Sequence, residues 1–247
     1  MRELLSNNFA FFFKEGKLKP VKRFDIVKLE NLIGIERQKE KLLKNTQKFL
    51  EGKPANNALL WGERGTGKSS LVKAVAYHFK DNGLKIIQVL KKDLSLILDL
   101  YDMIYDFPQY KFVLFIDDLA FEPYEDEFKE IKTVLNGTIQ AVPENLVFYI
   151  TSNRKNLIPV SFKDRQLEED TRALDLIEER LSLVDRFGLR IGFFSMDKET
   201  FLKTVEMYAE LFKVDIPKEE LHRLAKEYIA EVGKLSGRTA LQFVKSL

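Results

Sequence analysis

The chain contains no cysteine and only two histidines, His78 and His222, among its 247 residues. Without cysteine there is no disulfide framework and no thiolate metal site, and two histidines exclude a histidine-rich metal site. No apolar run approaches the ~20 residues of a membrane-spanning helix. The longest runs, such as Phe112–Ile116 and Leu146–Ile150, have the length of a strand. We therefore expect a cytoplasmic protein with no membrane partner.

The chain also lacks a large excess of either charge, because it contains 40 lysines and arginines and 38 acidic residues. A general polyanion binder usually carries a larger positive excess, so bulk charge gives no support to nucleic-acid binding. The aromatic run Phe9–Phe13 is best explained by core or interface packing. The basic residues that follow it leave a nucleic-acid surface open. They are Lys14, Lys17, Lys19, Lys22 and Arg23.

Five short β-branched or aromatic runs alternate with segments of helical periodicity. Continuous apolar runs suit strands buried on both faces, and their alternation with helices predicts βαβ units. We therefore predict an α/β fold with a five-stranded parallel sheet and helices on both faces. The strands are expected at Ala58–Trp61, Lys85–Leu90, Phe112–Asp117, Leu146–Thr151 and Leu189–Phe194. The helices are expected at Ile35–Leu50, Lys68–Lys80, Leu94–Tyr105, Glu127–Ile139 and Arg172–Leu183.

After the last of these strands the pattern becomes purely helical. Pro217 is placed to start one helix and Ser236 to cap another. The three helices are expected at Lys198–Phe212, Lys218–Ala230 and Gly237–Ser246. We expect three parts: residues 1–55, with an irregular stretch at Leu18–Val27 and a helix; 56–195, an α/β domain; and 196–247, an all-helical lid domain.

A glycine-rich loop follows the first expected strand and fits the pattern Gly-x4-Gly-Lys-Ser. Its glycines let the backbone curl so that successive N–H groups face phosphate oxygens, and the helix that follows adds its positive amino end. Lys68 is expected to bind the β- and γ-phosphates and Ser69 to bind Mg²⁺, so ATP or ADP with Mg is the predicted cofactor set. The loop residues expected to contact nucleotide are Gly62, Arg64, Gly65, Thr66, Gly67, Lys68, Ser69 and Ser70.

Polar residues end the third and fourth expected strands. Asp117 is placed to hold Mg²⁺, and Asp118 to orient or deprotonate the attacking water. Many such ATPases carry glutamate at the second position. The shorter aspartate predicts slow hydrolysis, or hydrolysis that depends on Glu122. Asn153 offers both a donor and an acceptor, which suits contact with the γ-phosphate and the water.

The order of these elements resembles the AAA+ ATPases from about Asn31 to the end of the chain. The resemblance implies that Ile33 and Gly34 pack near adenine and that Asn153 is the sensor-1 residue. It also implies that Arg238, at the head of the last helix, is the sensor-2 arginine. The pair of aspartates is similar to that of replication initiators and helicase loaders.

Arg186 lies in an Asp-Arg-Phe-Gly run that resembles the arginine-finger motif of the bacterial branch-migration motor. Such a finger usually comes from a neighbouring subunit and raises the rate by about 10³–10⁵. We expect Arg186 beside a strand end on the ligand side, and a homo-oligomer in the form of a ring or open ring. A surface pair with Asp185 or Glu179 is the alternative role. Arg172 and Arg180 are other candidates for action in trans.

Longer stretches of the chain resemble one bacterial family of uncharacterised AAA+ ATPases, catalogued as a domain of unknown function. That resemblance implies the fold and the nucleotide, but no client. It is carried by Leu59–Ala74, Asp117–Glu122, Thr151–Arg154 and Ser182–Gly188.

Three functions are consistent with the sequence. The first is an ATPase that remodels a protein or nucleic-acid partner, and the second is a slowly hydrolysing switch or loader, which the aspartate at position 118 favours. The third is a P-loop kinase, which the lid helices and the two arginines disfavour. The residues expected to act in hydrolysis are Lys68, Asp118, Asn153, Arg186 and Arg238.

Overall fold

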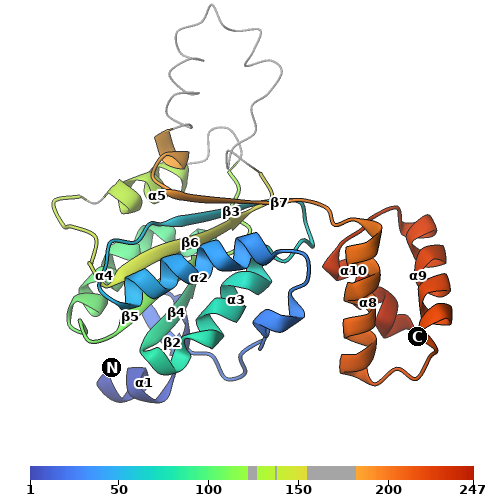
Figure 1. The fold of residues 1–247 in the computed structure, drawn as a ribbon. Helices are drawn as coiled ribbons and strands as arrows, with labels where there is room; N and C mark the ends of the chain where they lie inside the picture. Colours follow the sequence, from blue (N-terminus) through green and yellow to red (C-terminus); the bar gives the residue numbers. More distant parts are fainter. Residues whose placement is uncertain (122–126, 137, 155–181) are drawn as a thin grey trace, which may run out of the picture.

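The computed structural model describes residues 1–121, 127–136, 138–154 and 182–247. An α/β body and a separate group of three helices lie side by side and are joined by the segment that leaves the last strand (Figure 1). Within the described ranges, no helix is long and apolar enough to cross a membrane.

All five predicted strands are present, and the parallel α/β sheet is confirmed. Along the sheet they follow the order β4-β5-β6-β3-β7, and each neighbouring pair is parallel. Their bounds are β3 (Ala58–Gly62), β4 (Leu84–Val89), β5 (Lys111–Ile116), β6 (Leu146–Ser152) and β7 (Leu189–Phe193). Every residue of β6 is buried, and so is every residue of β5 after Lys111. Burial on both faces explains why these strands read as continuous apolar runs.

The predicted number of strands was wrong, because the described residues form a sheet of seven strands. The first twenty residues add β1 (Ala10–Lys14), which pairs in parallel with β4, and β2 (Lys17–Pro20), which pairs antiparallel with β1. Part of the stretch predicted to be irregular, Leu18–Val27, therefore forms the edge strand. The sequence pattern could not predict this pairing because β1 joins a strand far along the chain, and such non-local contacts leave no local signal.

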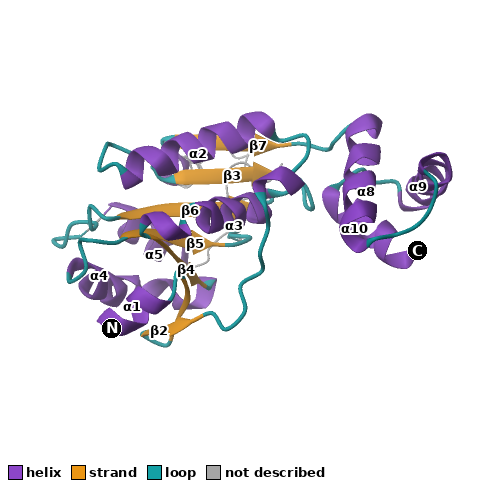
Figure 2. Ribbon diagram, turned by 60° about the horizontal axis from the view of Figure 1, so that its bottom comes forward, coloured by secondary structure: helices purple, strands orange, loops and turns teal. Residues whose placement is uncertain are grey.

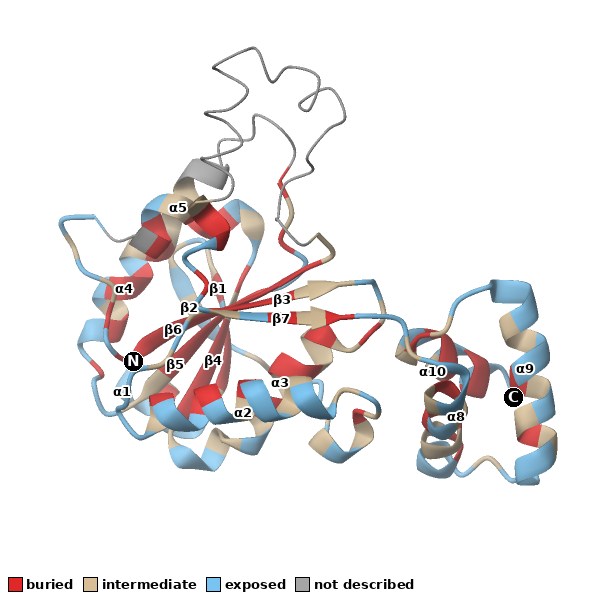
Figure 3. Cartoon of the chain, turned by 45° about the horizontal axis from the view of Figure 1, so that its top comes forward, coloured by how far each residue is buried: buried red, intermediate tan, exposed pale blue. Residues whose placement is uncertain are grey.

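Helices cover both faces of the sheet, as predicted. One face carries α2 (Glu36–Leu50) and α3 (Lys68–His78), and the other carries α1 (Arg2–Asn7), α4 (Ile97–Tyr105) and α5 (Glu127–Asn136). Figure 3 shows the buried strands enclosed between these two layers. Short 3₁₀ turns occur at Leu29–Asn31, Lys80–Asn82 and Lys91–Leu96. Most of the helix predicted at Arg172–Leu183 lies outside the described residues.

The three C-terminal helices, which we call the lid, enclose a core of their own. They are α8 (Lys198–Phe212), α9 (Lys218–Val232) and α10 (Gly237–Ser246). Phe201 and Phe243 are buried in that core. The predicted cap is confirmed, because the backbone N–H of Thr239 donates to Ser236 Oγ at 3.2 Å.

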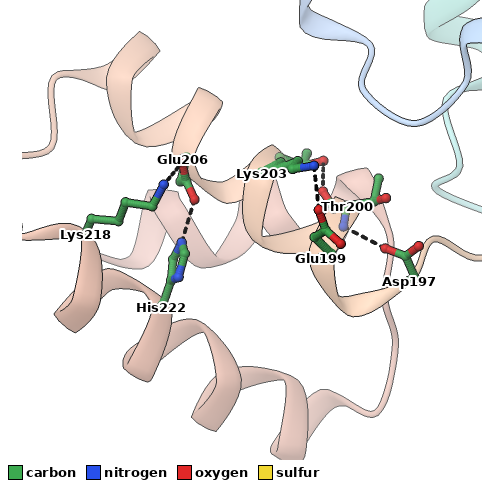
Figure 4. Close-up of polar contacts among 8 residues, drawn as sticks. Asp197, Glu199, Thr200, Lys203, Glu206, Lys218 and His222 are labelled. Atoms are coloured by element: carbon green, nitrogen blue, oxygen red, sulfur yellow. Dashed lines mark hydrogen bonds and ion pairs between the residues drawn. The ribbon is translucent and has the colours of Figure 1, made fainter.

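Ion pairs join the lid helices at their surface (Figure 4). Glu206 of α8 accepts from Lys218 Nζ at 2.8 Å and contacts His222 Nε2 of α9 at 2.6 Å. The hydrogen bond from Lys218 holds the pKa of the Glu206 carboxyl below its usual value, against the opposing effect of burial. At the amino end of α8, Asp197 accepts from the backbone N–H of Thr200 at 2.7 Å and caps the helix.

A buried polar cluster fastens α2 to the sheet. The Tyr149 hydroxyl of β6 accepts from Asn45 Nδ2 at 3.2 Å and lies 2.7 Å from Thr46 Oγ1. Asn45 also exchanges two hydrogen bonds with the backbone of Asn56, at 2.9 and 3.0 Å. The cluster thereby positions the segment that enters β3, and β3 leads directly to the glycine-rich loop.

Replacing Tyr149 with phenylalanine should lower the free energy of unfolding by about 1–2 kcal/mol, because a buried amide donor loses its acceptor. Burial raises the pKa of Tyr149 to about 12 from 10.0. The difference between wild type and Tyr149→Phe should therefore be full below pH 10 and shrink as the pH rises toward 12.

Denaturant unfolding at several pH values measures this difference. Tyr105→Phe is the matched control, because the Tyr105 hydroxyl also donates a hydrogen bond, to Ala141 O, but at an exposed position. Equal unfolding free energies for wild type and Tyr149→Phe at every pH would show that the cluster contributes nothing.

Candidate functional site

The glycine-rich loop joins the carboxyl end of β3 to the amino end of α3. Gly62, Gly65 and Gly67 have φ angles of +134°, +82° and +99°, which residues with a side chain rarely adopt. A Cβ on Gly62 would lie 1.9 Å from the carbonyl oxygen of Phe193. The path of the loop therefore requires glycine, and it places the unpaired N–H groups of the first turn of α3 beside the loop.

Lys68 is only 7% exposed, although it carries a charge. Its Nζ donates to the carbonyl oxygens of Gly62 at 2.8 Å and Glu63 at 2.6 Å, and to Asn153 Oδ1 at 3.1 Å. Burial lowers the pKa of the ammonium group, while the carboxylates of Asp118 and Asp117 oppose that shift. The loop thus holds a cation beside two carboxylates.

Asp117, at the end of β5, accepts two hydroxyl hydrogen bonds on one oxygen. Ser69 Oγ donates to its Oδ1 at 2.5 Å, and Thr151 Oγ1 donates to the same atom at 2.6 Å. A hydroxyl beside a carboxylate supplies the hard oxygen ligands that Mg²⁺ prefers. No three histidine, aspartate or glutamate side chains gather into a metal site within the described residues. The other oxygen ligands of a magnesium ion here would come from water or from a bound molecule.

Asp118 adopts a left-handed backbone conformation, with φ at +52°, which is uncommon for a residue other than glycine. Its N–H donates to Thr151 Oγ1 at 2.8 Å, and its carboxylate accepts from Asn153 Nδ2. Because Asn153 Oδ1 accepts from Lys68, one amide links the cation of the loop to the carboxylate after β5. The structure thus brings together the predicted residues from the ends of β3, β5 and β6.

A cavity of about 580 Å³ lies between the carboxyl edge of the sheet and the lid. Its polar lining includes the glycine-rich loop and the two aspartates. The lid contributes Arg238, which lines the cavity and whose N–H donates to Gly65 O at 3.4 Å. Its apolar lining residues are Leu32, Ile33, Ile35, Met196, Tyr208 and Leu241.

The loop is also connected to the segment that leads into the lid. Ser195, between β7 and α8, donates to Glu63 Oε2 at 2.6 Å. A Cβ on Gly65 would lie 2.9 Å from Ser236 Oγ, so the lid packs closely on the loop. The glycine-rich loop is therefore in direct contact with the start of the lid and with the segment that leads into it.

Most residues predicted to contact nucleotide line this cavity. Gly62 does not, but its carbonyl oxygen holds Lys68. Gly34 does not either, and packs against α8, because a Cβ there would lie 2.4 Å from Thr200 Cγ2. The predicted residues that line the cavity are Ile33, Arg64, Gly65, Thr66, Gly67, Lys68, Ser69, Ser70, Asp117, Asp118, Asn153 and Arg238.

The predicted position of Arg186 was wrong. It precedes β7, which runs parallel to β3, and the N–H of Leu189 donates to Asn57 O at the start of β3. Arg186 therefore lies near the amino edge of the sheet, opposite the cavity, where it is exposed. It cannot reach the site of its own chain. The alternatives Glu122, Glu179, Arg172 and Arg180 lie outside the described residues.

Sequence reasoning missed several residues of the site. Thr151 contacts both aspartates, and its place near the end of β6, two residues before Asn153, was the available signal. Lys73 lines the cavity one turn beyond Ser69 and pairs with Asp25 at 2.8 Å. The apolar residues of the lid could not be singled out, because helical periodicity does not distinguish a cavity-facing side chain from a core side chain.

Known structures share this fold at low sequence identity. A variant of Thermotoga maritima RuvB matches with a TM-score of 0.55 and 16% identity over 91% of this chain and 73% of its own. The T. maritima RuvB Holliday junction branch migration motor gives 0.53 and 16% over the same shares. The Escherichia coli MS115-1 HORMA:CdnC:Trip13 complex gives 0.52 and 15% over 89% and 90%. The chain therefore has the AAA+ fold seen in RuvB and Trip13.

A family model covers nearly the whole chain, since residues 6–247 match the model described as "Protein of unknown function (DUF815)". The match includes the glycine-rich loop, both aspartates, Asn153 and the lid. This chain is therefore a member of the DUF815 family and has an AAA+ fold.

Proposed function

We propose that the chain is a magnesium-dependent ATPase that couples ATP hydrolysis to movement of its lid and of neighbouring subunits, and so remodels or loads a macromolecular partner. The observation that carries this proposal is the amide of Asn153, which contacts both Lys68 and Asp118. One side chain thereby joins a phosphate-binding cation to a carboxylate that can act on water.

The lining of the cavity suits a nucleotide. Its apolar side chains, among them Ile33, Met196 and Tyr208, suit a purine base, which gains from contact with flat and flexible apolar side chains. Among its polar groups, Lys68 and Arg238 supply positive charge for the phosphates, and the amino end of α3 adds N–H donors. The volume of about 580 Å³ falls in the range of small-molecule sites.

The roles in hydrolysis follow from the contacts. Asp118 and Asn153 orient the attacking water, and the carboxylate of Asp118 accepts its proton. Lys68 and Arg238 stabilise the negative charge that develops on the transferred group. Ser69 and Asp117 would hold Mg²⁺, which supplies further charge stabilisation when bound.

Arg186 acts, in this proposal, on the nucleotide of an adjacent copy of the chain. Its exposure and its place at the edge opposite the cavity support a role in trans and exclude one in cis. The working unit would then be a homo-oligomer, a ring or an open ring, in which each site is completed by its neighbour. Figure 2 shows that the start of β7 and the lid lie at opposite ends of that strand.

A slowly hydrolysing switch or loader is the second candidate function. It is favoured by Asp118, whose carboxylate is one methylene shorter than glutamate and is already bonded to Asn153. Both features reduce its reach toward a water. The kinase alternative is disfavoured because the lid arginine, Arg238, lines the cavity where a kinase acceptor would need access.

Mixing two inactive variants tests the shared site. Lys68→Ala should lose hydrolysis because its own site fails, and Arg186→Ala should lose at least tenfold while it still binds ATP. An equal mixture should regain part of the activity, since Lys68→Ala subunits supply Arg186 to the intact sites of Arg186→Ala subunits. The measurement is phosphate release against total protein concentration.

Lys44→Ala, which changes an exposed lysine on α2, is the control and should keep the wild-type rate. Full activity of Lys68→Ala would overturn the assignment of the nucleotide site. Full activity of Arg186→Ala, or a specific activity independent of concentration, would overturn only the role in trans.

Thr151→Val should weaken the magnesium dependence of hydrolysis. Valine matches the shape of threonine but removes the hydroxyl that positions Asp117 and Asp118. Loss of these two hydrogen bonds should raise the Mg²⁺ concentration needed for half-maximal rate by about tenfold, equivalent to about 1.4 kcal/mol. Binding of ADP without Mg²⁺, measured by calorimetry, should change by less than about threefold.

Thr151→Ser keeps the hydroxyl and should behave like wild type. A Thr151→Val protein with an unchanged Mg²⁺ requirement would show that Thr151 has no part in the metal site.

A further inference from the structure

The outer hairpin of the sheet presents an exposed aromatic ring among lysines. In β1 the side chains alternate between faces, and Phe12 is 42% exposed while both of its neighbours are buried. Phe12 lies opposite Lys19 of β2, and Lys14 lies opposite Lys17. Directly opposed residues share a face of the sheet, so one ring and three lysines project from the same face. We call these four residues the hairpin face.

The ring of Phe9, next to the hairpin face, is covered by other aromatic rings, but in the described part of the chain the ring of Phe12 is not. Phe9, which precedes β1, packs against Phe24 with ring centroids 4.8 Å apart and against Tyr77 at 6.2 Å. Phe12 makes no ring contact within the described residues. Helix α3, the loop after β2 and the ring of Phe9 therefore close one end of the hairpin and leave the other end open.

The charge at the open end is positive. Lys92, which follows β4, is exposed and lies close enough to Glu15 to help Lys14 and Lys19 lower the pKa of that carboxyl, with Lys14 the largest cause. Glu15 pairs with Lys14 at 3.3 Å and with Lys19 at 3.9 Å. One glutamate is therefore near three lysines. Lys17 makes no ion pair within the described part of the chain.

The hairpin shares one edge of the sheet with Asp117. Strand β1 runs parallel to β4, so Lys14 ends at the same carboxyl edge of the sheet as Asp117. Only β4 separates β1 from β5, which places the two strands about 10 Å apart. Figure 2 shows β2 at the end of the sheet farthest from β7. A partner on the hairpin face would thus lie at the end of the sheet opposite β7.

We propose that the hairpin face binds single-stranded nucleic acid, with a base stacked on Phe12 and phosphates paired with Lys17, Lys19 and Lys92. An open sheet face that offers an aromatic ring among cations is suited to unpaired bases, whose flat faces are free to stack. The half-buried amide of Gln88, opposite Phe12 on β4, adds a donor and an acceptor for a base edge.

Other occupants fit this surface less well. A duplex keeps its bases stacked, so it would use the lysines but not the ring. A protein partner with an apolar contact surface would need a contiguous apolar patch, whereas here a single ring is surrounded by charge. The chain carries a formal net charge of only +2, so binding has to come from this local cluster and not from bulk attraction.

The test uses the full chain without nucleotide, so its outcome does not depend on the ATPase proposal. Fluorescence anisotropy would follow binding of labelled oligo-dT and oligo-U of about 20 nucleotides, longer than a typical single site, and of a duplex of equal length. Both single strands, or one of them, should bind more tightly than the duplex. The comparison of oligo-dT with oligo-U identifies whether DNA or RNA is preferred.

Phe12→Ala should weaken single-strand binding by about tenfold or more, whereas Phe12→Tyr, which keeps a ring, should retain it. The Lys17→Ala, Lys19→Ala double variant should reduce the slope of log affinity against log salt by about 1.4, since each phosphate contact contributes about 0.7. Lys41→Ala, Lys44→Ala on α2 removes two exposed lysines elsewhere and should leave the slope unchanged.

Any of three results would overturn the proposal: no binding of either single strand at low salt, equal binding by wild type and Phe12→Ala, or tighter binding of the duplex. Thermal melting of each variant checks that the exposed substitutions leave the fold intact.

Discussion

The hydrogen bonds of Asn153 are the contact on which the rest of the site depends. Its amide oxygen accepts from Lys68 and its amide nitrogen donates to Asp118, so its orientation is determined by both partners. The contact requires three strand ends to meet at one edge, which the parallel order of β3, β5 and β6 provides. Thr151 completes the arrangement by holding both aspartates. The parallel sheet thus brings these few polar atoms together at one edge.

The glycine-rich loop lies in direct contact with the lid and with the segment that leads into it. Glu63 contacts Ser195, and Gly65 contacts the start of α10, so no other element separates the loop from the lid. Glycine at position 65 allows the lid to approach this closely. If Arg186 completes the site of a neighbouring copy, the same phosphates would contact both the lid of their own subunit and Arg186 of the next one.

The sequence predicted what depends on local pattern and missed what depends on distant pairing. The apolar runs identified the strands β3 to β7, and the pattern Gly-x4-Gly-Lys-Ser identified the loop. The hairpin β1–β2 was not assigned, because its pairing with β4 has no local signature. The edge on which Arg186 lies was misjudged for a related reason: it follows from the direction of β7 in the folded sheet. Thr151 was not predicted as a site residue, because threonine is common in strands for its β-propensity alone.

The most direct measurement of the central claim is hydrolysis and ATP binding by Asn153→Leu, a variant of similar size that can neither accept from Lys68 nor donate to Asp118. The account predicts ATP affinity within about threefold of wild type and a hydrolysis rate at least about tenfold lower, because the loop and the apolar lining of the cavity persist while the water loses its orientation. An unchanged hydrolysis rate would contradict the account.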